Sequence, residues 1–292
     1  MNFPAPAEIS TYHNKSYPTI DISRPKLSAA GKTVFIIGGG SGLGLAFAQH
    51  FAKAGCTRIV ITGRRSNVLN AAKSSLEKEF NDLKLLALQG DVTDRTAVEA
   101  AFRTSHETFG TIDVLINNAG YLPDLGPISS ALQSDWWKGF EINVLGSFNV
   151  LSSFVPVGAQ NAVVVNTTSA AVNARVPGES AYSASKVATT RLFEHFQDEN
   201  PGLRVVNVAP GVVVTDMGRK AVHAFEVMGL PLPPEDDIRL PASYLVWAAS
   251  AEAEFIKGKF VWVNWDVDEL KHVIENAESK HILTLGVIGC QI

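Results

Sequence analysis

The stretch TVFIIGGGSGLG, residues 33–44, decides the fold of this chain. Four of its first five residues, Val34 to Ile37, form an uninterrupted apolar run, which predicts a buried strand at 33–37. A glycine-rich turn follows directly, and residues 43–53 then predict a helix. Backbone N–H groups at such a helix start can face a pyrophosphate, and glycines let it approach closely. The stretch therefore predicts a dinucleotide site in an α/β fold.

The remaining apolar runs extend this pattern along the chain. They predict further strands at 58–62, 84–89, 114–116, 162–165, 203–208 and 259–263. The chain has 292 residues, of which 46% are hydrophobic, so it can bury a substantial core. One large α/β domain is the simplest interpretation, and two domains are the less favoured one.

Charge and cysteine usage limit the classes of partner. With 25 basic against 29 acidic residues and no basic run, we expect neither a nucleic-acid nor an anionic-membrane partner. No apolar stretch approaches the ~18–20 residues that span a bilayer, and the N-terminus does not resemble a secretory leader. Cys56 and Cys290 follow no metal or disulfide-framework spacing, so we expect a cytoplasmic protein without a metal site.

A second stretch, NAVVVNTTSAAVNARVPGESAYSASK at 161–186, carries the candidate chemistry. Its strand ends at hydroxyl side chains on Thr167, Thr168 and Ser169, and ligands of open α/β sheets bind at this end. Tyr182 and Lys186 stand four residues apart, which places them side by side on a helix. An adjacent cation favours the phenolate and lowers the tyrosine pKa from ~10, which suits acid–base catalysis. The alternative is an ordinary surface pair.

Several motifs in this order resemble the short-chain dehydrogenase/reductase family. Ser169 precedes Tyr182 by thirteen residues, and Tyr-Ser-Ala-Ser-Lys follows, as in the active-site signature of that family. The glycine spacing at 38, 42 and 44, the NNAG at 117–120 and the PGVVVT at 210–215 match further family motifs. Ile37 stands where the family has a threonine, so any hydrogen bond from that hydroxyl is lost or replaced. The resemblance covers about residues 33–215.

This resemblance implies the fold and the catalytic residues. We expect a single-domain Rossmann-type doubly wound parallel β-sheet with helices on both faces. The implied catalytic residues are Asn143, Ser169, Tyr182 and Lys186. In reduction Tyr182 would donate the proton and Ser169 would polarise the carbonyl, while Lys186 would lower the Tyr182 pKa and hold the nicotinamide ribose. Asn143 would hold a water of the proton relay.

The resemblance also implies a set of cofactor-binding residues. Asp91 would contact adenine, and Thr215 would hold the nicotinamide carboxamide with backbone near Val213. The expected cofactor-binding residues are Gly38, Ser41, Gly42, Leu43, Gly44, Arg64, Arg65, Asp91, Val92, Asn118, Ala119, Gly120, Tyr182, Lys186, Pro210, Gly211, Val213 and Thr215.

The residues after the second predicted strand indicate which dinucleotide binds. An acidic side chain there accepts hydrogen bonds from the adenosine ribose, whereas an arginine accommodates a 2′-phosphate. This chain has Gly63, Arg64 and Arg65 at that point, which favours NADP(H) over NAD(H). The alternative is that these arginines are merely solvated. Ser41, where many NADP-preferring relatives carry a base, adds no second indication.

The segments outside the motif series predict three accessory regions. Residues 1–30 form a polar, proline-rich N-terminal arm that wraps the body or a neighbouring subunit, and 31–265 form the catalytic domain. Residues 216–240 predict a lid whose apolar side chains favour a hydrophobic or aromatic substrate. Residues 266–292 form an extension with an apolar end at 282–288, which we expect to pack on the domain or a partner subunit and to lie near the substrate mouth. The FVWVNWDVDEL at 260–270 resembles a subgroup common in filamentous fungi and associated with secondary metabolism.

Three functions remain open at this point. The first is an NADP(H)-dependent oxidoreductase that interconverts a carbonyl and an alcohol on a small molecule. The second keeps the fold and cofactor but performs non-redox chemistry, as a lyase, epimerase or cyclase. The third is a dinucleotide-binding protein without catalysis. Fold alone does not separate them. The resemblance further implies a homodimer or homotetramer.

Overall fold

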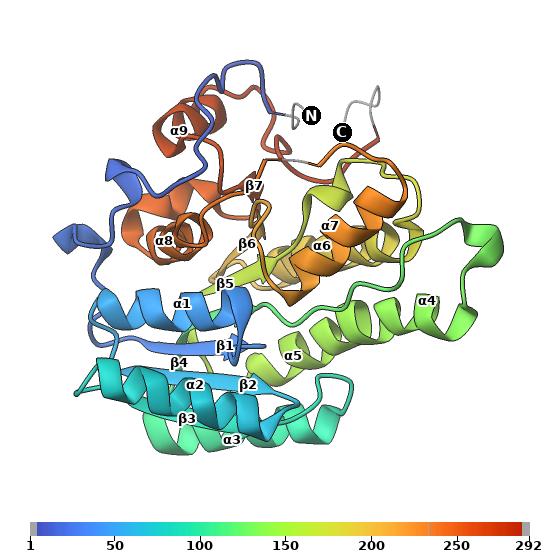
Figure 1. Cartoon of the computed structure of the whole chain (residues 1–292). Coiled ribbons are helices and arrows are strands. Elements are labelled where there is room, and N and C mark those ends of the chain that lie inside the picture. Colours follow the sequence, from blue (N-terminus) through green and yellow to red (C-terminus); the bar gives the residue numbers. More distant parts are fainter. Residues whose placement is uncertain (1–4, 233, 288–292) are drawn as a thin grey trace.

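The computed structural model describes residues 5–232 and 234–287 as one seven-stranded sheet flanked by helices (Figure 1). The strands are β1 (Thr33–Ile37), β2 (Arg58–Gly63), β3 (Lys84–Gln89), β4 (Ile112–Asn117), β5 (Gly158–Thr167), β6 (Arg204–Ala209) and β7 (Phe260–Trp262). The helices are α1 (Gly42–Lys53), α2 (Ser66–Glu79), α3 (Arg95–Phe109), α4 (Gln133–Phe140), α5 (Gly146–Phe154), α6 (Ser180–Glu199), α7 (Asp216–Val227), α8 (Arg239–Ala248) and α9 (Val267–Glu275).

All strand pairs are parallel, in the order β3-β2-β1-β4-β5-β6-β7. The chain therefore builds outward from β1 in one direction and from β4 in the other. This confirms the predicted doubly wound Rossmann-type sheet. Ligands of such sheets bind at the carboxyl ends of the strands beside the point where the order reverses, here between β1 and β4.

Alternate residues of each strand point to opposite faces, and each face carries its own helices. Val34 and Ile36 of β1 belong to a core with side chains from α1, α2 and α8. Phe35 and Ile37 belong to a second core with side chains from α3, α5 and α6. All five residues of β1 are buried, which explains its continuous apolar run.

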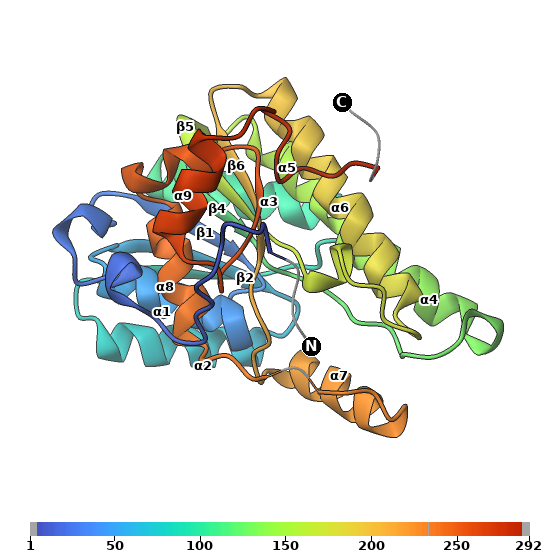
Figure 2. The same ribbon diagram turned by 90° about the horizontal axis from the view of Figure 1, so that it is seen from above.

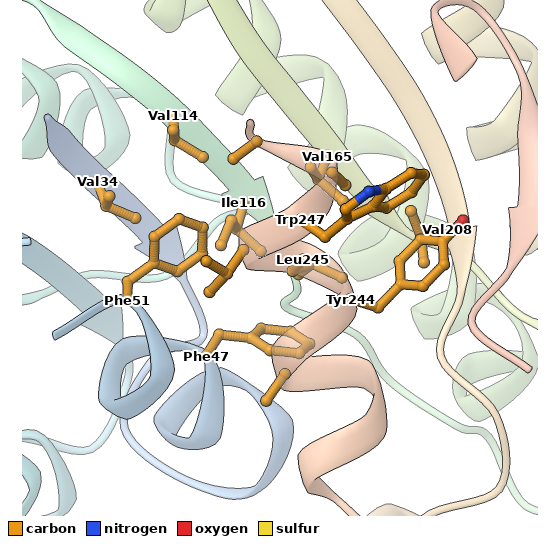
Figure 3. Close-up of a cluster of buried hydrophobic side chains, with 14 of the residues drawn as sticks. Val34, Phe47, Phe51, Val114, Ile116, Val165, Val208, Tyr244, Leu245 and Trp247 are labelled. Carbon is orange, nitrogen blue, oxygen red and sulfur yellow. The ribbon is translucent and has the colours of Figure 1, made fainter. Parts of the chain in front are cut away.

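The centre of the first core lies where α1 and α8 cross the sheet (Figure 3). Phe47 and Phe51 of α1 meet Tyr244, Leu245 and Trp247 of α8, and all five are at most 2% exposed. They cover valines and isoleucines of the four central strands, namely Val34, Val114, Ile116, Val165 and Val208. This packing holds the start of α1, and with it the glycine turn, against the edge of the sheet.

Residues 216–240 contain a helix where the sequence pattern indicated a loop. Helix α7 occupies Asp216–Val227, and the Thr215 hydroxyl accepts a hydrogen bond from Gly218 N at 3.1 Å at its start. In Figure 2 it lies at the edge of the molecule, apart from the sheet. Its action as a lid stays a prediction.

The N-terminal arm packs on the C-terminal half of its own chain (Figure 1). His13 N donates to Asn264 O at 2.7 Å, and Val267 N donates to the Tyr17 hydroxyl at 3.1 Å. Thr11 and Ser10 both bind the Glu269 carboxylate. The described residues of the arm therefore pack on the body of the same chain, which is one of the two expected locations.

The C-terminal extension begins with α9 and then turns back along the sheet edge. Phe260 N of β7 donates to Leu283 O at 2.7 Å, and Leu285 N donates to Glu194 Oε1 of α6 at 2.7 Å. The described part of the predicted apolar end, 282–287, thus lies on the domain, whereas Ile288 lies outside the described residues. No helix in the described part of the chain is long and apolar enough to cross a bilayer.

Candidate active site

A cavity of about 510 Å³ opens at the carboxyl ends of the strands. The turns after β1 to β6 and helix α7 surround it. Of the predicted cofactor-binding residues, all line this cavity except Gly44, and Ser169 lines it too. In the described chain no residue after Leu232 lines this cavity, and the expected position of the extension over the substrate mouth stays a prediction.

The glycine turn provides a bare backbone surface at one end of the cavity. Gly38 and Gly42 adopt φ of +75° and +54°, a region that favours glycine. A Cβ on Gly44 would lie 2.1 Å from Gly38 O, and one on Gly42 would lie 3.2 Å from Thr215 Cγ2. Side chains are thus excluded at the N-terminus of α1, where backbone N–H groups suit a pyrophosphate. These features fit a dinucleotide.

Arg64 and Arg65 follow β2 at the same end of the cavity. Arg64 Nη1 lies 4.0 Å from Asp91 Oδ2, and the two side chains are 58% and 38% exposed. A pair this long and exposed is weak, so the guanidinium is free to move to an anion. The structure therefore brings the predicted arginines and the predicted adenine contact together.

A ladder of buried amides fixes the sheet below the cavity. Asn117 Nδ2 donates to Asn166 Oδ1 at 3.1 Å, and Asn166 Nδ2 donates to Asn207 Oδ1 at 2.8 Å. These residues occupy matching positions on β4, β5 and β6. Asn118 Nδ2 then donates to Gly38 O at 3.2 Å and ties the glycine turn to the end of β4. Each buried amide thus has a partner and helps to hold the cavity floor.

The three central predicted catalytic residues lie together in the cavity. Lys186 Nζ donates to Thr167 O at 2.9 Å and lies 5.7 Å from the centre of the Tyr182 ring. Ser169 lies close enough to Tyr182 to lower the pKa of its phenol. Its Oγ also accepts from Ala171 N at 3.2 Å, which orients the hydroxyl at the end of β5. Helix α6 and the end of β5 thereby present a phenol, a hydroxyl and an ammonium to one space.

The prediction that Lys186 lowers the Tyr182 pKa is wrong for this structure. Burial raises the pKa of Tyr182 to about 12, although the hydrogen bond from Ser169 opposes this shift. Burial also lowers the pKa of Lys186 to about 8. Removal from water disfavours the charged forms of both groups. Tyr182 is therefore a neutral phenol at pH 7, which is the proton-donating form.

Asn143 lies behind the cavity rather than in its wall. It belongs to a π-helical segment, Glu141–Leu145, between α4 and α5. Its Oδ1 accepts from Tyr121 N at 2.8 Å, and its Nδ2 donates to Ser185 Oγ at 2.9 Å. A Cβ on Gly120 would lie 3.7 Å from both Asn143 Oδ1 and Lys186 Nζ. Asn143 is thus close to the lysine, and its part in a proton relay stays a prediction.

Other wall residues were not among the predicted site residues. Their apolar members include Leu122, Val176, Met217, Ala221, Val222, Phe225 and Leu232. Met217, Ala221, Val222 and Phe225 belong to α7, and their spacing marks one face of a helix. Glu179 also lines the cavity, although an acid at a helix start is ordinarily explained by the helix dipole. The described residues contain no group of three or more histidine, cysteine or acidic side chains that could hold a metal.

Comparisons with known proteins agree with this geometry. A family model described as short chain dehydrogenase matches residues 32–225. Short chain dehydrogenase/reductase AacuD of Aspergillus aculeatus is 30% identical over 282 residues, covering 95% of each chain. Short chain dehydrogenase pigC of Monascus ruber is 34% identical over 271 residues, covering 89% of this chain and 87% of that protein. The crystal structure of levodione reductase matches with a TM-score of 0.74 and 27% identity, over 80% of this chain and 96% of that one. The chain therefore belongs to the short-chain dehydrogenase/reductase family.

Proposed function

We propose that the chain is an NADP(H)-dependent oxidoreductase that interconverts a carbonyl and an alcohol on a hydrophobic or aromatic small molecule. The observation that carries this proposal is the shared cavity of Ser169, Tyr182 and Lys186 with the glycine turn. A dinucleotide binder without catalysis needs only the turn, whereas the three polar side chains suit proton transfer. Family membership supports a nicotinamide dinucleotide as the cofactor.

When bound, the dinucleotide supplies or accepts a hydride at the substrate carbon. In reduction, Ser169 and Tyr182 hold the substrate oxygen by hydrogen bonds. Tyr182 keeps its proton at neutral pH because burial raises its pKa to about 12, and it releases the proton as negative charge develops on that oxygen. Lys186 uses one Nζ hydrogen on Thr167 O and keeps two for the ribose hydroxyls. Asn143 orients the segment beside Lys186 and supports the return of the proton.

The preference for NADP(H) rests on Arg64 and Arg65 after β2. Both line the cavity, and Gly63 occupies the position from which an acidic side chain would repel a 2′-phosphate. A planar guanidinium binds a phosphate through paired hydrogen bonds. NAD(H) is the less favoured cofactor.

The apolar wall supports a hydrophobic or aromatic substrate. Met217, Phe225 and Leu232 lie in or after α7 and line the same cavity as Ser169. The fungal origin of the relatives and the FVWVNWDVDEL segment support a role in secondary metabolism. A cytoplasmic location and a homodimer or homotetramer belong to the same proposal. For the assembly, support comes from an exposed apolar row that runs from α4 to the residue after α5, with Trp137, Phe148 and Val155 between 47% and 54% exposed.

Titration and turnover measurements test the proposal. The purified chain is titrated with NADPH and NADH, and NADPH absorbance is then followed with carbonyl compounds from small to polycyclic. We expect tighter binding of NADPH and loss of one NADPH for each alcohol formed. Product formation without net NADPH loss would instead assign non-redox chemistry such as lyase, epimerase or cyclase activity. Binding without any product would leave a dinucleotide-binding protein.

A further inference from the structure

Glu179 places a buried carboxyl group in the cavity, and the proposed chemistry does not use it. The residue is 9% exposed and precedes Tyr182 by three positions at the start of α6. Within the described chain its side chain has no hydrogen-bond or ion-pair partner. Burial raises the pKa of Glu179 to about 7. An unpartnered buried carboxyl group is costly, and such groups are typical of functional sites.

The backbone around Glu179 is held rigidly on both sides. Glu179 N donates to Val176 O at 3.2 Å, and Gly178 O accepts from Gly126 N at 3.0 Å. On the other side, Trp136 Nε1 donates to Ser180 Oγ at 3.1 Å. The carboxyl group thus stands on a fixed support. Such preorganisation is what recognition of a particular ligand atom requires.

The position of Glu179 relative to Tyr182 fixes which part of a substrate it can reach. Side chains three residues apart on a helix have Cβ atoms about 5–6 Å apart on one face. The Glu179 carboxyl group is close enough to the phenol to raise the Tyr182 pKa. When Tyr182 binds the carbonyl oxygen of a substrate, Glu179 can therefore reach a second polar atom of the same substrate. This second atom would lie several bonds away from the carbonyl oxygen.

The surroundings select the kind of polar atom. The nearby wall contains Leu122, Val176 and Phe225, so the partner of Glu179 must leave water. Lys186 already places an ammonium in this cavity, and a second cation would meet its repulsion. A hydroxyl group costs far less to desolvate than an ammonium, and its hydrogen satisfies the carboxyl oxygen.

We propose that Glu179 is a substrate-recognition residue that accepts a hydrogen bond from a substrate hydroxyl, so that the preferred substrates are hydroxylated ketones with an apolar or aromatic skeleton. This rests on the proposed function, because the carbonyl end of the substrate is assigned to Tyr182. It adds a substrate class to that function. Ether or deoxy analogues of the same skeleton are poorer ligands because they leave the carboxyl group unpaired.

The test compares monohydroxy tetralones, with the hydroxyl at successive ring positions, with their methyl ethers. For each pair, kcat/KM is measured with NADPH, and Kd is measured by calorimetry without turnover. We expect the wild type to prefer at least one hydroxy compound over its ether by roughly 10–100-fold. Glu179→Leu should reduce this ratio to about one while reduction of the ethers continues. Glu179→Gln keeps an amide oxygen as hydrogen-bond acceptor, so it should reduce the preference for the hydroxy compound less than Glu179→Leu does.

Glu194→Gln serves as the matched control. Glu194 is a second buried carboxyl residue of α6, but it binds Leu285 N of the extension and does not line the cavity. This variant should keep the hydroxyl preference of the wild type. A melting temperature for each variant separates loss of recognition from loss of folding, and Glu179→Gln decides the matter if Glu179→Leu does not fold.

Three results would overturn the assignment of Glu179. The first is equal Kd and kcat/KM values for hydroxy compounds and their ethers in the wild type. The second is an unchanged preference for the hydroxy compound in both Glu179 variants. The third is an equal loss of kcat on every substrate while that preference stays intact. Failure of the proposed function would look different. In that case no ketone would consume NADPH, while the hydroxyl preference in Kd, and its loss in Glu179→Leu, would still be measurable.

Discussion

Lys186 Nζ lies 5.7 Å from the centre of the Tyr182 ring and donates a hydrogen bond to Thr167 O at 2.9 Å. The bond to the last residue of β5 fixes the ammonium beside the phenol, one helical turn along α6. Ser169 approaches the same phenol from the loop after β5. Helix α6 and strand β5 therefore position the proposed acid, its neighbouring cation and the polarising hydroxyl together.

The buried charge of Lys186 predicts a pH-dependent stability. Burial lowers the Lys186 pKa to about 8, whereas the unfolded chain titrates from the ordinary value of 10.5. Between these values the unfolded chain binds more protons, so the free energy of unfolding rises as pH increases from about 8 to 10.5. This contribution is on the order of 3 kcal/mol.

Urea denaturation at several pH values measures this slope. At pH 7, Lys186→Met should have a larger free energy of unfolding than the wild type, because it buries no charge. Between pH 8 and 10.5, its free energy of unfolding should rise less than that of the wild type. Lys32 and Lys259 also have lowered pKa values through burial, so the difference between the two curves is the informative quantity. Parallel curves for wild type and variant would show that Lys186 stays charged in the folded chain.

Arg64 and Arg65 should determine the choice of dinucleotide. Replacing both with alanine should weaken NADPH binding roughly 10–100-fold, because charge-assisted hydrogen bonds to the 2′-phosphate are lost. NADH binding should change by about twofold at most, since NADH lacks that phosphate. Fluorescence titration gives both Kd values. Arg95→Ala, which removes an exposed arginine paired with Glu99 on α3, is the control. Equal weakening for both dinucleotides would refute the NADP(H) preference.

Asp236 should couple the segment after β7 and the N-terminal arm to the cavity. It is 3% exposed, its Oδ2 accepts from Val212 N at 2.8 Å, and its Oδ1 accepts from Asn264 Nδ2 at 2.9 Å. Asn264 Nδ2 also donates to His13 O in the arm at 2.9 Å. Asp236→Ala leaves buried donors without partners and should destabilise the chain by about 2–4 kcal/mol.

The same substitution should weaken NADPH binding, because Gly211 and Val213 beside this network line the cavity. Denaturant unfolding and NADPH titration measure the two effects. The control is Glu235→Ala, at an exposed neighbouring position. If stability fell while the NADPH Kd stayed unchanged, the network would support the fold without positioning the cavity loop.

The exposed apolar row that runs from α4 to the residue after α5 should form a subunit interface. Trp137, Leu145, Phe148 and Val155 recur at helical spacing and are each at least 47% exposed. Phe148→Glu should convert an oligomer to monomers, because it places a charge in an apolar contact. Light scattering during size-exclusion chromatography measures the mass, with exposed Arg103→Glu on α3 as control. A monomeric wild type, or a variant of unchanged mass, would argue against this interface.

The sequence predicted the sheet well because its signals are local. Helices cover both faces of β1, so all residues from 33 to 37 are buried. The mostly apolar run in the sequence therefore begins and ends where the strand does. Helix α7 was missed although Met217, Ala221, Val222 and Phe225 have helical spacing, because the glycine and prolines after it suggested a loop. The helix faces a cavity rather than a core, so its apolar pattern is incomplete.

The electrostatics of the site depended on contacts between distant segments. Glu179 is buried in a cavity that Leu122 and Phe225 also line, and no local sequence pattern predicts that these distant residues share a cavity. The Tyr182 pKa depends on the balance between burial and neighbouring charge. The spacing to Lys186 predicted that the two groups meet, but it did not predict which effect is larger.

Replacement of Tyr182 by phenylalanine tests the proposed chemistry most directly. The change removes the proton donor and leaves the ring, the glycine turn and the arginines in place. NADPH oxidation with a ketone that the wild type reduces is measured beside NADPH binding by fluorescence titration. We expect turnover to fall by at least about 10²–10⁴-fold while the NADPH Kd changes little. A Tyr182→Phe enzyme that reduces the ketone at the wild-type rate would contradict the assignment of Tyr182 as the acid.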